Sequence, residues 1–286
     1  MTSAQRPSRG PGHVCWTYRD PARFEARARE WLLAGLAAGE RVRYVGDTPA
    51  PEVLSRWRED PRWRDALDGG AAQVVAVGDA YAGLTVGPEE AVAVYQALTR
   101  SALDDGFTGL RVVADGTTLV GSPARLRAFA RYEHLVDRFM RTAPMTAACG
   151  YDRRRLDDRT IEELASLHRA ADPGATMFHL HAADDADADL VLAGELDTSN
   201  QDLFANALRH VDVASSVDAD HADYGPAAEL VIGAHDLRFV DHRSLVHLQR
   251  HAERRGTTVV LRTGLAPAAR LVRMLGLSRV RVEAGR

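Results

Sequence analysis

The 286-residue sequence predicts an α/β protein with two domains. Segments with the alternation or the β-branched runs of strands take turns with segments that have the apolar spacing of helices. The expected helices are long enough to cross over between parallel strands. The length exceeds the roughly 100–200 residues of one domain, and a hydrophobic content of 45% is enough for two cores.

The first predicted α/β unit covers residues 11–155. Its first helix should start at Asp20-Pro21, because Asp is a preferred cap and Pro fits the first helical position. Strands are expected at 13–18, 41–45, 72–77, 109–114 and 145–151, and helices at 21–39, 52–57, 88–102 and 123–139. Ligands of such sheets bind at the carboxyl ends of strands. Gly46-Asp47, Gly78-Asp79 and Asp115-Gly116 are expected there, with ordinary turns as the alternative.

Residues 156–176 are expected to connect this unit to a second one at 177–286. Thr160 and Glu163 fit a capping box, which predicts a connecting helix that continues through His168. In the second unit Thr198 or Ser199 should cap a helix that runs to residue 211. The other elements are expected as strands at 176–181, 189–193, 229–233, 257–261 and 278–282, helices at 242–255 and 267–275, an acidic turn at 183–189 and a loop at 212–228.

Composition excludes several classes of function. The chain has no lysine, so it holds neither a Walker A loop nor a Schiff-base amine. Serine-hydrolase, dinucleotide-binding and zincin motifs are also missing. We therefore predict no catalytic residue and no cofactor. The alternative is a metal-dependent α/β enzyme that holds a divalent ion at its Asp-rich strand ends.

Charge and hydropathy limit the partners and the location. A net charge of −4 gives no reason to expect a nucleic acid partner. No apolar run reaches the roughly 18–20 residues of a membrane span, and residues 1–10 lack the apolar core of a secretory signal. Two cysteines are too few for a disulfide framework. We therefore expect a cytoplasmic protein.

Several separated motifs in residues 177–282 recur in a known order and spacing. They are Gly194-Glu195-Leu196-Asp197, then Asp236-Leu237 with Phe239-Val240-Asp241, then Leu271 and Leu275-Gly276-Leu277. In these motifs the C-terminal half resembles a STAS domain of the anti-sigma-factor antagonists. The resemblance implies binding to an anti-sigma factor, which is a histidine-kinase-like ATPase, or to other STAS proteins.

The regulatory loop departs from that pattern. Where the family has Asp-Ser-Ser-Gly, this chain has Asp241, His242, Arg243 and Ser244. Arg243 stands at the phosphate-acceptor position and accepts no phosphate, whereas Ser244 lies about 100° further around the helix. Three alternatives stay open: partner binding without a phosphorylation switch, phosphorylation of Ser244, and an inert scaffold. The partner-binding residues implied are Asp197 and these four.

Four blocks of residues 11–155 recur in the order of another family. They are His13-Val14-Cys15 with Tyr18, Leu36 with Gly39-Glu40-Arg41, Gly106 to Val112, and Cys149 to Arg154. In these blocks the N-terminal half resembles a MEDS domain, a sensory module of methanogen and methylotroph regulators. The resemblance implies sensing of small organic compounds. It also implies a three-layer parallel-sheet fold related to RecA-like ATPases without their ATP loop, which agrees with the missing lysine.

The candidate sensor residues are His13, Cys15, Tyr18, Cys149 and Tyr151. His13 and Cys15 are two positions apart, so they share one face of a strand. If the first and last strands are neighbours, both cysteines meet His13. An organic-ligand pocket, a zinc or other soft-metal site, a redox cysteine pair and ordinary core residues are all open, and we assign no metal ligand.

Together the two halves predict a signalling regulator of transcription. The N-terminal half would sense a small molecule and the C-terminal half would act as an anti-sigma-factor antagonist. A STAS scaffold that senses nothing is the alternative.

Overall fold

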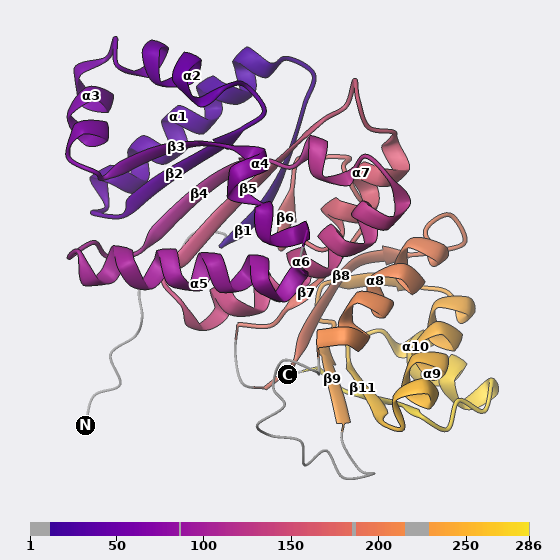
Figure 1. The fold of residues 1–286 in the computed structure, drawn as a ribbon. Helices are drawn as coiled ribbons and strands as arrows, with labels where there is room; N and C mark the ends of the chain where they lie inside the picture. Colours follow the sequence, from indigo (N-terminus) through magenta and orange to yellow (C-terminus); the bar gives the residue numbers. More distant parts are fainter. Residues whose placement is uncertain (1–11, 86, 185–186, 215–228, 286) are drawn as a thin grey trace, which may run out of the picture.

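The computed structural model describes residues 12–85, 87–184, 187–214 and 229–285. The expected N-terminal tail, residues 185–186 of the acidic turn and most of the loop at 212–228 lie outside the described residues. Two sheets organise the described chain, and Figure 1 shows them side by side with helices around both. The predicted α/β class is confirmed. No helix of the described ranges is long and apolar enough to cross a membrane.

The N-terminal half is built on a six-stranded parallel sheet in the order β3-β2-β4-β5-β1-β6. Its strands are β1 (His13–Tyr18), β2 (Arg41–Gly46), β3 (Ala72–Ala76), β4 (Leu110–Asp115), β5 (Met145–Asp152) and β6 (Ala170–Ala171). Its helices are α1 (Pro21–Ala37), α2 (Ala50–Trp57), α3 (Pro61–Asp68), α4 (Val77–Ala80), α5 (Pro88–Asp104), α6 (Pro123–Thr142) and α7 (Asp158–Ala165), with 3₁₀ turns η1 (Ala82–Thr85) and η2 (Thr117–Val120).

Helices cover both faces of this sheet, which gives the expected three layers (Figure 1). One apolar core joins α1, α2 and α3 to side chains of one face, among them Val14 and Trp16. A second core joins α5 and α6 to the other face, which carries Cys15 and Cys149. Alternate residues of β1 therefore enter different cores, as the pleat of a strand requires.

The C-terminal half contains a mixed sheet. Parallel pairs give the order β10-β8-β9-β11-β12, and β7 pairs antiparallel with β8. The strands are β7 (Phe178–Ala182), β8 (Leu190–Leu196), β9 (Glu229–Gly233), β10 (Leu237–Val240), β11 (Thr258–Arg262) and β12 (Val280–Glu283), and the helices are α8 (Gln201–Ala214), α9 (His242–Arg255) and α10 (Ala266–Met274). The predicted order of elements is confirmed, with β10 added in the segment of the Phe239-Val240-Asp241 motif.

The predicted connecting helix is wrong in its start and its end. Its cap is Asp157, whose side chain accepts from the Thr160 N–H at 2.8 Å, so Thr160 lies inside the helix. The helix stops at Ala165, and the chain then forms β6, which pairs with β1 and lengthens the first sheet. The residues after Ala165 therefore belong to the first sheet and to the protein core and do not continue the helix.

Two smaller expectations also differ from the structure. Pro61 starts the helix α3, for which the sequence predicted no element, and the Asp60 side chain caps it by accepting from the Arg62 N–H. Helix α8 begins at Gln201, where the Asn200 carbonyl accepts from the Phe204 N–H. Thr198 and Ser199 therefore precede the cap position that was predicted for them.

Helix α6 connects the two halves of the molecule. It packs on α5 in the N-terminal half and on α8 and β7 in the C-terminal half. Ala130 of α6 is fully buried in the C-terminal core together with Leu167. One face of α6 packs against the first sheet and another face packs against the second, so few of its side chains are exposed to solvent.

Candidate functional site

The two strands that carry the sensor candidates are neighbours. Strands β1 and β5 pair in parallel, and Cys15 stands beside Cys149 in the register. His13 shares a face with Cys15, and Tyr151 shares a face with Cys149, because side chains two positions apart point to the same side of a strand. The predicted convergence of His13 and both cysteines on one face of the sheet is therefore confirmed, and Tyr151 lies on the same face, while the role of these residues in ligand binding stays a prediction.

Helix α6 brings two carboxylates to the same place. Glu133 and Asp137 are one helical turn apart and so lie on one face of α6. Both are buried, Glu133 completely. Ser122 starts this helix by accepting from the Arg125 N–H, and Pro123 occupies its first turn. The local sequence thus specifies the helix, and the packing of α6 between two sheets buries its acidic pair.

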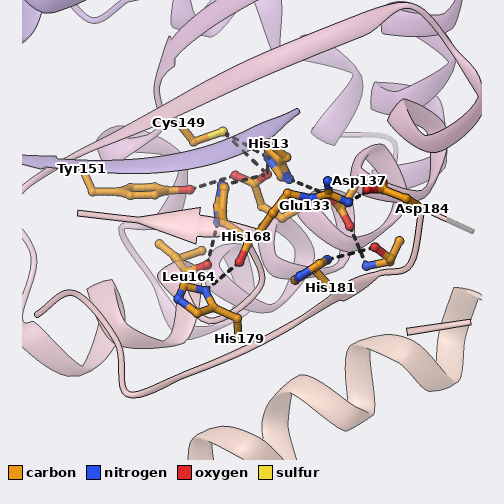
Figure 2. Close-up of polar contacts among 12 residues, drawn as sticks. His13, Glu133, Asp137, Cys149, Tyr151, Leu164, His168, His179, His181 and Asp184 are labelled. Atoms are coloured by element: carbon orange, nitrogen blue, oxygen red, sulfur yellow. Dashed lines mark hydrogen bonds and ion pairs between the residues drawn. The ribbon is translucent and has the colours of Figure 1, made fainter. Parts of the chain in front are cut away.

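His13 is held between the two carboxylates (Figure 2). Its Nδ1 lies 3.2 Å from Asp137 Oδ1, and its Nε2 lies 3.1 Å from Glu133 Oε2. Cys149 Sγ is 3.7 Å from His13 Nε2 and also 3.7 Å from Glu133 Oε2. The Tyr151 hydroxyl donates to Glu133 Oε1 at 2.8 Å. We call these residues, together with His168, the buried polar cluster.

His168 completes the cluster from the segment between α7 and β6. Its ring lies 4.0 Å from the ring of His13, centroid to centroid, and it is fully buried. Its Nδ1 is 2.9 Å from the Leu164 carbonyl oxygen, which only accepts, so Nδ1 carries the proton. Its Nε2 points toward Glu133 Oε2 at 3.8 Å and makes no hydrogen bond.

Burial and hydrogen bonding together set the charges of the cluster. Burial acts to lower the pKa of His13, but hydrogen bonds to Asp137, Cys149 and Glu133 outweigh it and raise that pKa well above its ordinary value. Burial acts to raise the pKa of Glu133, yet the imidazoles of His168 and His13 lower it. Burial, with the charge of His13, lowers the pKa of His168 to about 4. Burial raises the pKa of Cys149 to about 12. An imidazolium between two carboxylates therefore stands beside a neutral imidazole and a thiol.

Two bonds tie the cluster to the C-terminal half. Asp137 uses its second oxygen, Oδ2, to accept from the Ala182 N–H of β7 at 2.7 Å. The backbone oxygen of His168 lies 2.7 Å from Nδ1 of His179, also on β7 (Figure 2). Next to them, the Leu180 N–H donates to the Ser166 carbonyl at 2.7 Å. The edge of β7 that does not pair with β8 is thus hydrogen-bonded to groups that surround the cluster.

Tyr18 is the one sensor candidate that lies elsewhere. It is an odd number of residues from His13 and Cys15, so the pleat turns it to the opposite face. Its hydroxyl donates to Asp115 Oδ2 at 2.6 Å, and its ring stacks on Phe24. It lines a surface hollow of about 340 Å³ near the carboxyl end of β1, together with Trp16, Arg19, Arg23 and Arg27.

The aspartates expected at strand ends are distributed over this edge of the sheet. Asp115 ends β4, and Asp47 follows β2 directly and pairs with Arg155 at 2.8 Å. Asp79 instead lies in α4, where it is exposed. Among the described residues these aspartates form no metal-binding group, and the strand-end prediction is met in position by two of the three pairs.

The five partner-binding candidates lie at the carboxyl ends of two neighbouring strands. Asp197 follows β8 and Asp241 follows β10, and these strands pair in parallel. Asp241 caps α9 by accepting from the Ser244 N–H at 2.8 Å. His242 and Arg243 are exposed on the first turn of α9, whereas the Ser244 side chain is completely buried. Phosphorylation of Ser244 stays a prediction, and its burial argues against it in this conformation.

Gly194, which lies within β8, shows why the Gly194-Glu195-Leu196-Asp197 motif begins with glycine. Its φ of +91° lies in the region that favours glycine. A Cβ there would stand 2.3 Å from the Met177 carbonyl oxygen. The backbone of the segment before β7 therefore approaches β8 more closely than any side chain permits.

Sequence patterning missed Glu133, Asp137 and His168. A signal existed for the first two, because acidic residues four positions apart share one helix face. That pattern is common on solvated helices, so burial was needed to distinguish it. His168 carried no local signal, because it was expected on a charged connecting helix.

Four residues of the cluster offer metal-binding atoms at one place. One donor atom each from His13, Glu133, Cys149 and His168 lies within 4.8 Å of the others. Cys15 is not among them. Both cysteines are free thiols, and burial raises the pKa of Cys15 well above its ordinary value, which makes it unreactive as a thiolate.

Comparison with known proteins identifies the N-terminal half. The model of the MEDS family, described as the MEthanogen/methylotroph, DcmR Sensory domain, matches residues 12–169. No curated protein and no solved structure matches the chain. The matched segment includes every residue of the buried polar cluster and ends before β7, so the STAS resemblance stays a prediction. Because the match covers more than half of the sequence, the chain belongs to the MEDS family of sensory domains, which gives it a role in sensing or signalling.

Proposed function

We propose that this protein is a signalling regulator in which the MEDS domain senses a small ligand and the C-terminal half acts as an anti-sigma-factor antagonist. Membership in the MEDS family supports the sensing role. The ordered STAS-like motifs support the antagonist role, with a histidine-kinase-like anti-sigma factor as the partner. In this proposal the protein is a binding protein and catalyses no reaction.

The observation that carries the proposal is the bonding of β7 to the buried polar cluster. One carboxylate, Asp137, joins His13 on one side to the Ala182 N–H on the other. In this proposal, a change of charge or position at His13 would reach the edge of the C-terminal sheet through a single side chain. Spatial connection alone does not establish coupling, so this link needs a direct test.

The proposed partner surface consists of Asp197, Asp241, His242 and Arg243. Exposure of His242 and Arg243 on the first turn of α9 supports direct contact with a partner. A cation at a helix N-terminus opposes the helix dipole by a few tenths of a kcal/mol, roughly, which favours a binding role for Arg243. Burial of the Ser244 side chain supports an antagonist without the phosphorylation switch.

The buried polar cluster is unsuited to catalysis on an organic substrate. His13, Glu133 and His168 are each at most 1% exposed, so a substrate would have to open the protein to reach them. A general acid or base needs contact with its substrate within hydrogen-bond reach. Sensing of a ligand that fits inside the cluster is compatible with this burial.

The test is a pull-down from the source cell with the full chain as bait. We expect recovery of an ATPase-type anti-sigma factor, and loss of it with Arg243→Glu, which reverses the charge of the partner surface. Arg100→Glu is the matched control, because Arg100 is exposed on α5 in the other half. Recovery of no such ATPase by the folded bait, or equal recovery with both variants, would favour the alternative of a scaffold that binds something else.

A further inference from the structure

His168 has a buried lone pair that the protein leaves without a partner. Since Nδ1 donates its proton to the Leu164 carbonyl, Nε2 of the neutral ring is an acceptor. It points at Glu133 Oε2, which is another acceptor, at 3.8 Å, and makes no hydrogen bond. Two acceptors that face each other in a fully buried site are unfavourable unless a cation or a proton lies between them.

The spacing of the donor atoms suits a tetrahedral metal ion. A zinc ion with bonds of about 2.0 Å to nitrogen or oxygen and about 2.3 Å to sulfur holds its ligand atoms about 3.3–3.6 Å apart. Glu133 Oε2 lies 3.1 Å from His13 Nε2, 3.7 Å from Cys149 Sγ and 3.8 Å from His168 Nε2. These distances and the 3.7 Å between Cys149 Sγ and His13 Nε2 lie within a few tenths of an ångström of that spacing, and all four donor atoms lie within 4.8 Å of one another.

The hydrogen-bond partners of the four candidate ligands are of the kinds that support metal-binding side chains in other proteins. Metal-binding histidines usually donate their other ring N–H to a carboxylate or a backbone carbonyl, which fixes the ring. His13 Nδ1 faces Asp137 Oδ1, and His168 Nδ1 faces the Leu164 oxygen. Glu133 receives the Tyr151 hydroxyl on the oxygen that the donor set does not use. Each of these partners contacts an atom other than the proposed metal ligand, so the ligand atoms stay available to an ion.

Charge balance favours a divalent ion of the zinc class. Binding of the ion would release the Nε2 proton of His13 and the thiol proton of Cys149. Two neutral imidazoles, one carboxylate and one thiolate then bring two negative charges, which a divalent ion neutralises inside the protein. Imidazole and thiolate suit zinc and its neighbours, whereas Mg²⁺ and Ca²⁺ prefer sites made of oxygen. The ion and its four ligands are then neutral together, and the carboxylate of Asp137 keeps its contacts with the His13 ring and the Ala182 N–H.

We propose that His13, Glu133, Cys149 and His168 bind one zinc-class transition-metal ion. The sequence alone assigned no metal ligand here, because buried cysteines and a lone histidine are more often ordinary core residues. Four protein ligands fill a tetrahedral ion, so the site is of the closed kind and leaves no position for a substrate. The inference does not rest on the proposed partner, because ion binding is measured on this chain alone.

Binding would also affect the junction with the C-terminal half. The ion would bind Nε2 of His13 and Nε2 of His168. The carboxylate that contacts the other nitrogen of His13 accepts from the Ala182 N–H of β7, and the backbone oxygen of His168 contacts His179 of β7. Loss of the ion would therefore loosen the two residues that hold this strand. Ion occupancy is in this way a candidate for the sensed signal.

The experiment uses the tag-free full chain, stripped with a chelator and titrated with Co²⁺, which reports its ligands by absorption. We expect one ion per chain, with d–d bands of tetrahedral intensity and a thiolate-to-cobalt charge-transfer band, and displacement of both by Zn²⁺. Cys149→Ser should remove the charge-transfer band. Cys15→Ala is the matched control, because Cys15 is a fully buried neighbour outside the donor set, and it should keep the band.

The cobalt spectrum of the unsubstituted chain tests the proposed metal site even where a variant fails to fold. No ion retained after gel filtration, or cobalt bands without thiolate character, overturns the proposal. So does a charge-transfer band that disappears with Cys15 and persists without Cys149. A retained ion together with a failed pull-down would leave the metal site in place and reject only the anti-sigma partner.

Discussion

At the scale of single residues, Glu133 is the centre of the structure's most unusual site. It is a fully buried carboxylate that receives the Tyr151 hydroxyl and faces two histidines and a thiol. A buried charge is tolerated where hydrogen bonds and an opposite charge surround it. His13 supplies that charge, and Asp137 shares it from the other side of the ring.

Glu133→Gln should therefore destabilise the protein strongly. The substitution keeps the shape but removes the negative charge opposite the buried His13, and losing one partner of such a pair costs about 3–5 kcal/mol. The free energy of unfolding, from urea titration, measures the loss.

Asp68→Asn is the control for that measurement. Asp68 pairs with Arg58 at 2.7 Å but is 57% exposed, and surface pairs contribute about 0–1 kcal/mol. Equal, small losses in both variants would contradict the view that the buried charges of the cluster depend on each other.

At the scale of elements, helix caps explain where the chain changes direction, and one cap coincides with the proposed partner surface. Asp241 begins α9, and Gly256, with a φ of +65°, ends it. The second oxygen of Asp241 and the Ser244 hydroxyl are buried without a hydrogen-bond partner. Asp241 therefore has a structural role that any test of partner binding has to separate from a binding role.

The pair Asp241→Asn and Asp241→Ala makes that separation. Asn caps a helix as well as Asp does, whereas Ala costs about 1 kcal/mol, so only the Ala variant should lose stability in urea. If the carboxylate contacts the partner, the Asn variant should recover less anti-sigma factor than the unsubstituted chain at equal stability. Unchanged recovery by the Asn variant would assign Asp241 to the cap alone.

At the scale of the whole molecule, two α/β units meet at the helix α6 and along one edge of the strand β7. Helix α6 contributes to both cores, and β7 is bonded to the second sheet on one side and to Asp137, Ser166 and His168 on the other. Such an arrangement lets a local change in the first half alter the edge of the second. Coupling of this kind is expected to appear as local opening of β7.

Hydrogen exchange measures that opening. In Glu133→Gln, residues 178–182 of β7 should exchange faster than in the unsubstituted chain, and by a larger factor than residues 258–262 of β11, which lie on the far side of the second sheet. The strand β11 serves as the internal control for a general loss of stability. An equal acceleration in both strands would show that the halves respond only as one folding unit.

The sequence by itself determined the elements and part of the site. Apolar periodicity located most strands and helices within a few residues, and Asp20 marked a cap that the structure contains. The spacing of His13 and Cys15, with Cys149 on a later strand, was enough to expect their convergence. These signals are local or depend only on which strands are neighbours.

The tertiary structure alone decided which polar residues are buried and what they face. Glu133, Asp137 and His168 are residues that usually contact solvent, and nothing near them in the chain states otherwise. They meet His13 from positions more than a hundred residues away because α6 is enclosed by two sheets and β6 pairs with β1. Burial is a property of the assembled fold, and only there do an orphaned lone pair, two carboxylates and a thiol become one site.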